Sequence, residues 1–295
     1  MQPLRNEKRG RPSSITRARL LVLLLCGGLV AWLLLPAVRD EHGQIAQPES
    51  TASSLLDGAL KLARRSGTLE ALDAVLARAR EQATRTPTDA GTWRVMADAH
   101  LERALYRVYL RGLRVGEPFF QELTQDLEQE IDAGLTAVQT ARAHGDECGT
   151  LYRIEALLLS QKITSVMSAL RYNGAISRSL ASATERAGDD PDVQQALGLR
   201  KLLSPQMFGH DAAAALQHFE RAARDGEDER ACVYAGMACQ LLGQAEAALG
   251  WLERAARRNP GNMFARAVLA RLRGGEDDPF GRDVTAEELA ALPAR

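Results

Sequence analysis

The strongest constraint on this chain is a helical spacing of apolar residues that runs almost without interruption from Ser54 to Arg273. Apolar positions recur every three or four residues, and no segment alternates with the period of two that marks a strand. Breaks rich in Gly, Pro, Asn and Asp divide the pattern at intervals that suit helical hairpins. The sequence therefore predicts an all-α fold, with helices at Ser54–Arg65, Leu69–Thr84, Ala90–Leu113, Phe119–His144, Thr150–Tyr172, Ala175–Ala187, Asp192–Leu203, Ala212–Arg224, Arg230–Leu242, Ala245–Arg258, Met263–Leu272 and Ala286–Ala291.

The stretch from Asp228 to Asn262 carries a regular pattern of small and apolar residues. Small side chains at a crossing let two antiparallel helices approach to about 8–10 Å. The spacing resembles the tetratricopeptide repeat, a helical hairpin of about 34 residues that binds other proteins. Cys232 and Cys239 stand where that family favours Trp and Tyr, so thinner packing is expected there. The matching positions are Ala235, Gly236, Gly243, Ala248, Leu252, Ala255 and the closing Pro260.

The segment before this unit repeats the signature. After Pro191, the helix crossing is matched by Leu197 and Gly198. The second helix is matched by Ala215, Phe219 and Ala222, and Asp211 is expected to cap it. A last segment, Met263–Leu272, resembles the first helix of a truncated unit. The resemblance covers residues 191–272, and we predict long, degenerate, repeat-like hairpins over 55–190. Residues 273–295 are predicted to form a loop and a capping helix, because Thr285 and Glu288 match a capping box.

An uncharged run of 19 residues, Leu20–Val38, follows a basic N-terminus. As a helix it would rise about 28 Å, close to the hydrocarbon thickness of a bilayer. The positive-inside rule then puts residues 1–19 in the cytoplasm and the rest of the chain outside. We predict a single-pass signal anchor at 20–38 and a polar linker at 39–54. Lys occurs only four times among the basic residues, a bias typical of a GC-rich bacterial genome, so the expected location is a bacterial inner membrane with a periplasmic repeat domain.

Two alternatives to a retained anchor stay open. A cleaved signal peptide has an apolar run of only about 7–15 residues, and Leu35-Pro36-Ala37 is a poor cleavage site. A lipoprotein would use Cys26, but Leu25 precedes it where a small residue is expected, and the apolar run continues well beyond it.

No motif in the chain indicates chemistry. The formal net charge is −1, which gives no excess of positive charge for nucleic acid. The histidines lack metal-ligand spacing, and the four cysteines suggest no disulfide or metal pair. Asp98, His100 and Glu102 are expected to point in different directions around a helix, so a solvated helix face rather than a metal site is expected there. We therefore predict no catalytic residue, no cofactor, no metal and no nucleic-acid partner.

The resemblance implies that a partner binds along the face lined by the first helices of the hairpins. A mostly apolar lining with two amides suits a helix or an extended apolar peptide. Met237 and Gln240 are the favoured contacts, while each leucine could equally be packed core. The predicted lining comprises Val233, Met237, Gln240 and Leu241 in the best unit, Gln195, Leu199, Leu202 and Leu203 in the preceding one, and Arg271 in the last helix.

Together these features predict a membrane-anchored tetratricopeptide-type scaffold or adaptor that binds a protein or peptide on the extracytoplasmic side. A second hypothesis is an exported protein that binds a small ligand. The long upstream hairpins followed by degenerate repeats resemble the T component of tripartite ATP-independent transporters. That function would require an enclosed apolar pocket among the long hairpins.

Overall fold

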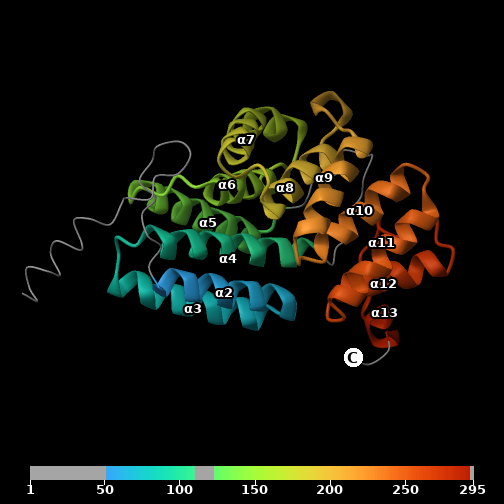
Figure 1. Cartoon of the computed structure of the whole chain (residues 1–295), viewed down its shortest axis with the longest axis horizontal. Helices are drawn as coiled ribbons and strands as arrows, with labels where there is room; N and C mark the ends of the chain where they lie inside the picture. Colours follow the sequence, from blue (N-terminus) through green and yellow to red (C-terminus); the bar gives the residue numbers. More distant parts are fainter. Residues whose placement is uncertain (1–50, 110–122, 293–295) are drawn as a thin grey trace, which may run out of the picture. The chain divides into compact units, whose positions relative to one another are not determined.

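The computed structural model describes residues 51–109 and 123–292, which belong to one compact unit, Glu49–Arg295 (Figure 1). The predicted anchor Leu20–Val38 lies outside the described residues. Within the described ranges, no helix has the length and apolar character needed to cross a membrane. The helices are α2 (Thr51–Ser66), α3 (Leu69–Arg85), α4 (Ala90–Tyr109), α5 (Gln125–Ala143), α6 (Gly149–Gln161), α7 (Val166–Ala187), α8 (Pro191–Leu203), α9 (Ala212–Asp225), α10 (Arg230–Leu241), α11 (Ala245–Arg258), α12 (Met263–Arg273) and α13 (Ala286–Ala291), with a 3₁₀ turn η1 (Gln206–Phe208).

The helices form successive hairpins, α2–α3, α4–α5, α6–α7, α8–α9 and α10–α11, followed by α12 and α13. The first helices of neighbouring hairpins also pack on one another, from α2 through α4, α6 and α8 to α10. Each second helix contacts the first helix of the next hairpin. This is the stacking of a helical-repeat protein, and it confirms the predicted all-α hairpin architecture for the described residues.

Local sequence signals fix most of the helix ends. The Asp211 side chain accepts a hydrogen bond from the Ala214 amide at 2.9 Å, which confirms the predicted cap of α9. Thr285 and Glu288 form both bonds of the predicted capping box at α13. Between α10 and α11, Gly243 takes the left-handed φ of +72° that the predicted turn requires.

The third hairpin turns at a different place from the one predicted. We expected helices at Thr150–Tyr172 and Ala175–Ala187, but α6 ends at Gln161 and α7 continues without a break through Gly174. The turn forms at 162–165 because Ser165 starts α7 with its own capping box. Its hydroxyl accepts from the Ser168 amide at 3.1 Å, and the Ser168 hydroxyl accepts from the Ser165 amide at 2.8 Å. The capping box of Ser165 and Ser168 therefore decides where the turn forms, and Gly174 is accommodated inside the helix.

The boundaries of α4 and α5 also differ from expectation. Helix α5 begins at Gln125 rather than Phe119, because the Thr124 side chain caps it by accepting from the Leu127 amide. Helix α4 is described as far as Tyr109, so the predicted extension to Leu113 lies outside the described residues.

Glycines at the helix crossings account for the close packing of the last hairpins. A Cβ atom at Gly198 would lie 2.5 Å from the Phe219 ring, and one at Gly236 would lie 3.2 Å from Leu252. The Phe219 ring also meets the Tyr234 ring of the next hairpin, with centroids 5.5 Å apart. The glycines that the sequence marked as crossings thus lie where the two helices of a hairpin approach closely.

Replacing Gly198 with Ala should destabilise the protein by about 1–3 kcal/mol, because the added methyl group overlaps a fully buried ring. Gly250→Ala is the matched control, since its Cβ would meet nothing within 4 Å and alanine is the better helix former by about 1 kcal/mol. Urea unfolding of the full chain measures both. Equal stabilities of the two variants would contradict the crossing assignment.

Candidate protein-interaction site

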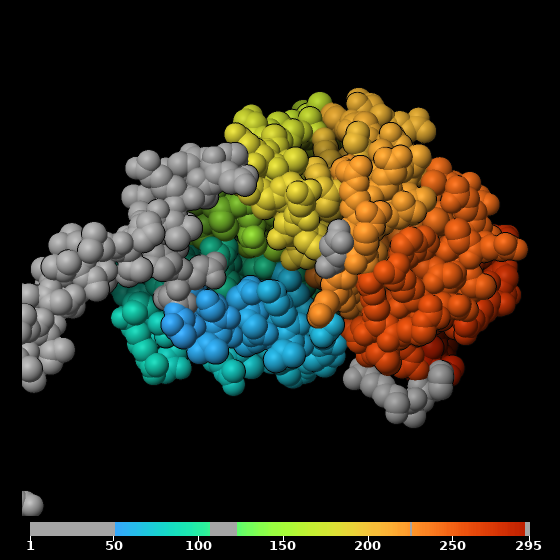
Figure 2. Space-filling model, viewed as in Figure 1, coloured from blue at the N-terminus to red at the C-terminus, as the bar shows by residue number. Residues whose placement is uncertain are grey.

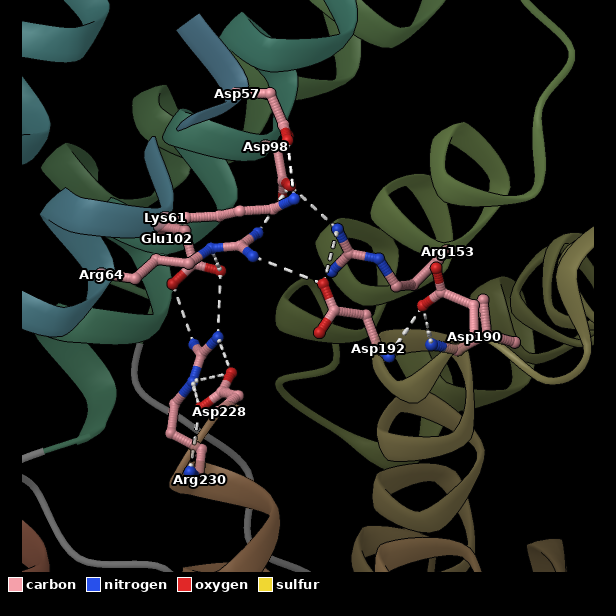
Figure 3. A network of polar contacts seen from close by, with 11 residues as sticks. Asp57, Lys61, Arg64, Asp98, Glu102, Arg153, Asp190, Asp192, Asp228 and Arg230 are labelled. Atoms are coloured by element: carbon pink, nitrogen blue, oxygen red, sulfur yellow. Dashed lines mark hydrogen bonds and ion pairs between the residues drawn. The ribbon is translucent and has the colours of Figure 1, made fainter. Parts of the chain in front are cut away.

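A network of opposite charges connects the first helices of five successive hairpins (Figure 3). Its arginines and carboxylates come from segments that lie up to 166 positions apart in the sequence, from 64 to 230. We call it the first-helix charge network. Its members are Arg64 of α2, Asp98 and Glu102 of α4, Arg153 of α6, Asp192 of α8, Arg230 of α10 and Asp228 just before α10.

Arg64 is the centre of the network. Its Nη2 atom lies 2.6 Å from Asp98 Oδ2, and its Nε atom lies 3.0 Å from Glu102 Oε1. Its Nη1 atom lies 3.3 Å from Asp192 Oδ2. One guanidinium therefore holds α2, α4 and α8 together, and its planar fork suits three carboxylates at once.

Two further arginines extend the network to α6 and α10. Arg153 Nη2 donates to Asp98 Oδ2 at 2.9 Å, so this carboxylate is shared by two guanidinium groups. Arg230 Nη1 donates to Glu102 Oε2 at 2.8 Å, and its Nη2 donates to Asp228 Oδ2 at 2.6 Å. Three positive and four negative groups nearly balance, although Asp98 Oδ1, Arg64 Nε and Arg153 Nε are buried without a hydrogen-bond partner.

In this network burial disfavours the charged forms of the side chains, while their ion pairs favour these forms and have the larger effect on the pKa values. Burial disfavours the charged form of Asp98, but the positive charges of Arg153 and Arg64 lower the pKa of this carboxyl below its ordinary value. At Asp192, the same arginines outweigh burial and lower the pKa to about 2. Burial likewise opposes the charge of Arg64, yet the Asp98 and Glu102 carboxylates raise its pKa above its ordinary value. These groups therefore remain charged at neutral pH.

The end of α2 also touches the connections between the last hairpins. Asn259 Nδ2 donates to the Arg65 carbonyl oxygen at 3.2 Å, and a second Asn259 bond reaches Glu229 Oε1 at 2.8 Å. The Arg65 side chain lies 3.0 Å from Glu227. Residues almost 200 positions apart thus pack directly, so contacts in this unit are not limited to neighbouring hairpins.

The sequence did not indicate this network. Asp98, His100 and Glu102 were expected on a solvated face, and that expectation was wrong, because all three are buried. His100 Nδ1 lies 2.6 Å from Glu130 Oε1 of α5. Asp98 and Glu102 stand four residues apart on one face of α4, a spacing that marks a shared direction but does not reveal distant arginines. Among the described residues, no group of three His, Cys, Asp or Glu side chains could hold a metal ion.

Most of the predicted lining of the partner-binding face lies in the core. Met237 is 1% exposed, because neighbouring helices cover α10 on both sides. Leu241 and Leu203 are exposed, while Gln240 is partly exposed and donates through Nε2 to the Asp277 carbonyl oxygen at 3.3 Å. The binding role of the whole set stays a prediction. The buried members are Val233, Met237, Leu202, Leu199 and Gln195.

Arg271 lies in the core of the C-terminal segment. Its Nε donates to Glu288 Oε1 at 2.8 Å, and its Nη1 donates to the Pro279 carbonyl oxygen at 2.9 Å. Its Nη2 donates to the Asp283 carbonyl oxygen at 2.8 Å. This side chain therefore holds the segment after α12 in place, and its donors are engaged within the chain.

The accessible apolar side chains of the last hairpins gather at their turns. Leu203 ends α8, Met207 lies in η1, Leu241 ends α10 and Leu242 follows it. Helices α8 and α10 are the first helices of neighbouring hairpins, and they are in contact. We call Leu203, Met207, Leu241 and Leu242 the turn-edge surface. It contains Leu241 and Leu203 and adjoins Gln240, three of the residues predicted from the sequence.

Comparison with solved structures agrees with this stacking. The chain is similar to TTC0263, described as a thermophilic TPR protein of Thermus thermophilus, with a TM-score of 0.53 and 14% identity over 74% of this chain and 98% of that one. It is also similar to a chain of the APC/C hetero-tetramer Cut9–Hcn1, with a TM-score of 0.52 and 15% identity over 78% of this chain, but it spans only 38% of that chain. The fold is tetratricopeptide-like. No family model and no curated protein matches the sequence.

Replacing Asp98 with Asn should destabilise the tetratricopeptide-like unit by about 3 kcal/mol or more, because two buried guanidinium groups lose their shared counter-charge. Glu81→Gln provides the control, since it removes an exposed pair with Arg85 of α3 that contributes about 1 kcal/mol or less. Urea unfolding compares the two. A loss at Asp98→Asn as small as that of the control would show that the network is not structural.

The low pKa of Asp192 predicts a specific acid sensitivity. Its carboxyl has a pKa of about 2 in the folded protein and about 3.9 in an unfolded chain, so its contribution is complete above pH of about 4. That contribution is lost as the pH falls from about 4 to about 2. The urea midpoint of the native protein should therefore drop more between about pH 5 and about pH 3 than that of Asp192→Asn. Parallel drops would contradict the assignment.

Proposed function

We propose that this protein is a non-enzymatic, membrane-anchored scaffold of the tetratricopeptide type that binds another protein or peptide. The stacked-hairpin fold carries this proposal, since such repeats present surfaces for binding rather than catalytic groups. Leu20–Val38 serves as the anchor, with the repeat domain on the extracytoplasmic side of a bacterial inner membrane. The uncharged length of this run and the basic residues before it support that placement.

The turn-edge surface is the part of the predicted binding face that a partner can reach. Leu241 is 41% exposed, and Leu242, the next residue, and Leu203, at the end of α8, are exposed as well. The charged groups of the first helices are engaged with one another, so they favour no charged peptide. An apolar or amphipathic partner segment fits best, with Gln240 near its rim supplying a polar contact.

The experiment is affinity purification of the full chain from an alkali-washed membrane fraction, with mass spectrometry of the co-purifying proteins. Recovery of a stoichiometric partner from washed membranes supports both the scaffold role and the anchor. Loss of the chain in the alkaline wash would contradict the anchor. A preparation that carries only a small molecule would contradict the scaffold role.

Leu241→Glu should reduce partner recovery at least about tenfold, because a charge at an apolar contact must be desolvated on binding. Leu170→Glu is the matched control, since Leu170 is an exposed leucine on another helix, α7. A charge at Met237 would instead destabilise the fold, because that side chain is buried. Unchanged recovery with Leu241→Glu and a normal circular dichroism spectrum would overturn the proposed surface.

A further inference from the structure

The exposed side of α7 carries aliphatic and basic side chains together. Val166 is 46% exposed, Met167 is 74% exposed and Leu170 is 54% exposed. Arg171 and Arg178 of the same helix are exposed as well. At about 100° per residue, these five positions fall within about 140° of the helix circumference, away from its buried side. Figure 2 shows α7, in yellow-green, at the surface of the molecule. We call these five residues the α7 surface.

Acidic residues are missing from the part of the sequence that forms this surface. There is no Asp or Glu between Glu155 and Glu185, or between Asp192 and Asp211, although these stretches contain five Lys or Arg residues. The whole chain, by contrast, has a formal net charge of −1. The two stretches cover most of α7 and α8, which pack on each other. The α7 surface is therefore locally positive in a protein that is nearly neutral.

The arginines at this surface have neutral neighbours instead of counter-charges. The Arg171 guanidinium lies over the Tyr172 ring, 5.4 Å from its centroid. Arg200 reaches this side of α7 from α8 and donates to the side-chain oxygen of Asn173. Burial lowers the pKa of Arg200, and no neighbouring carboxylate raises it. Among the described residues, no ion pair involves Arg171, Arg178 or Arg200. Their charges are therefore available to an anionic ligand.

Positive charge beside exposed aliphatic side chains is the combination by which a helix binds an anionic membrane surface. Arg171 and Arg178 stand seven positions apart, about 10 Å along the helix axis. A protein partner would need carboxylates fixed at matching positions, whereas lipid phosphates can move to meet each guanidinium. The large exposed fractions of Met167 and Leu170 leave both side chains free to enter the boundary between headgroups and acyl chains. The chemistry of the α7 surface therefore fits lipid better than protein.

We propose that the α7 surface binds an anionic phospholipid bilayer, with its aliphatic side chains below the headgroups and its arginines at the phosphates. Arg200, at the border with α8, adds a third positive charge. Each basic residue near an anionic bilayer strengthens the association, and salt weakens it. The anchor Leu20–Val38 would hold α7 close to such a bilayer, and this one support rests on the proposed function.

Quenching of a fluorophore by lipid, measured on the full chain, tests the proposal. The background is Cys26→Ser with Cys148→Ser, since the remaining Cys232 and Cys239 are buried and should not react. A nitrobenzoxadiazole label on Met167→Cys reports contact with brominated acyl chains. The vesicles are phosphatidylcholine with or without phosphatidylglycerol, so that only the negative charge of the bilayer differs.

The matched control is the same label on Leu62→Cys. Leu62 of α2 is 70% exposed, and the neighbouring Lys61 is paired with Asp57 at 2.9 Å within the same helix. The label at Met167→Cys should be quenched more strongly in anionic than in neutral vesicles, because the arginines draw α7 to the anionic surface. The label at Leu62→Cys should give the same signal in both.

Neutralising the two exposed arginines should remove the difference between the vesicles. Arg171→Gln with Arg178→Gln, in the Met167→Cys background, should lower the ratio of membrane-bound to free α7 about tenfold or more in anionic vesicles. Both side chains are exposed and belong to no ion pair of the described residues, so the circular dichroism spectrum should not change.

Equal quenching of the Met167→Cys label in neutral and anionic vesicles would overturn the proposal, and so would quenching no greater than that of the Leu62→Cys label in anionic vesicles. Shielding of the Met167→Cys label by a co-purifying protein in detergent, without quenching by lipid, would assign the surface to an acidic protein instead. Whether the chain stays with neutral vesicles is a separate readout of the anchor, so failure of the anchor and failure of this proposal can be told apart.

Discussion

The contact on which the rest of this structure depends is the shared ion pair of Arg64, Asp98 and Arg153. In an ordinary repeat stack each hairpin touches only its neighbours, and stability is close to a sum of local terms. Here Arg64 ties the first hairpin to the second and the fourth, and Arg230 ties the fifth to the second through Glu102. Buried charges cost several kcal/mol each to desolvate, so an unpaired member would be strongly destabilising. The hairpins should therefore unfold together rather than fray singly.

The same network limits where a binding surface can lie. The faces of the first helices that other stacks can offer to a ligand are here engaged with one another, both by charge and by apolar packing around Met237. What is left accessible in the last hairpins lies at their turns, where Leu203 and Leu241 are exposed. A stack stabilised internally in this way can keep its shape without a ligand. It also leaves a smaller accessible surface on the first helices.

The hairpins of this fold were predictable because their signals are local. Gly236 and Leu252 meet within one hairpin, and a cap such as Asp211 acts within three residues. The network was not predictable, because each acid looks like an ordinary solvated residue until an arginine from a distant helix is placed beside it. The turn at 162–165 was missed for a different reason, since a glycine inside α7 gave a stronger break signal than the Ser165 cap.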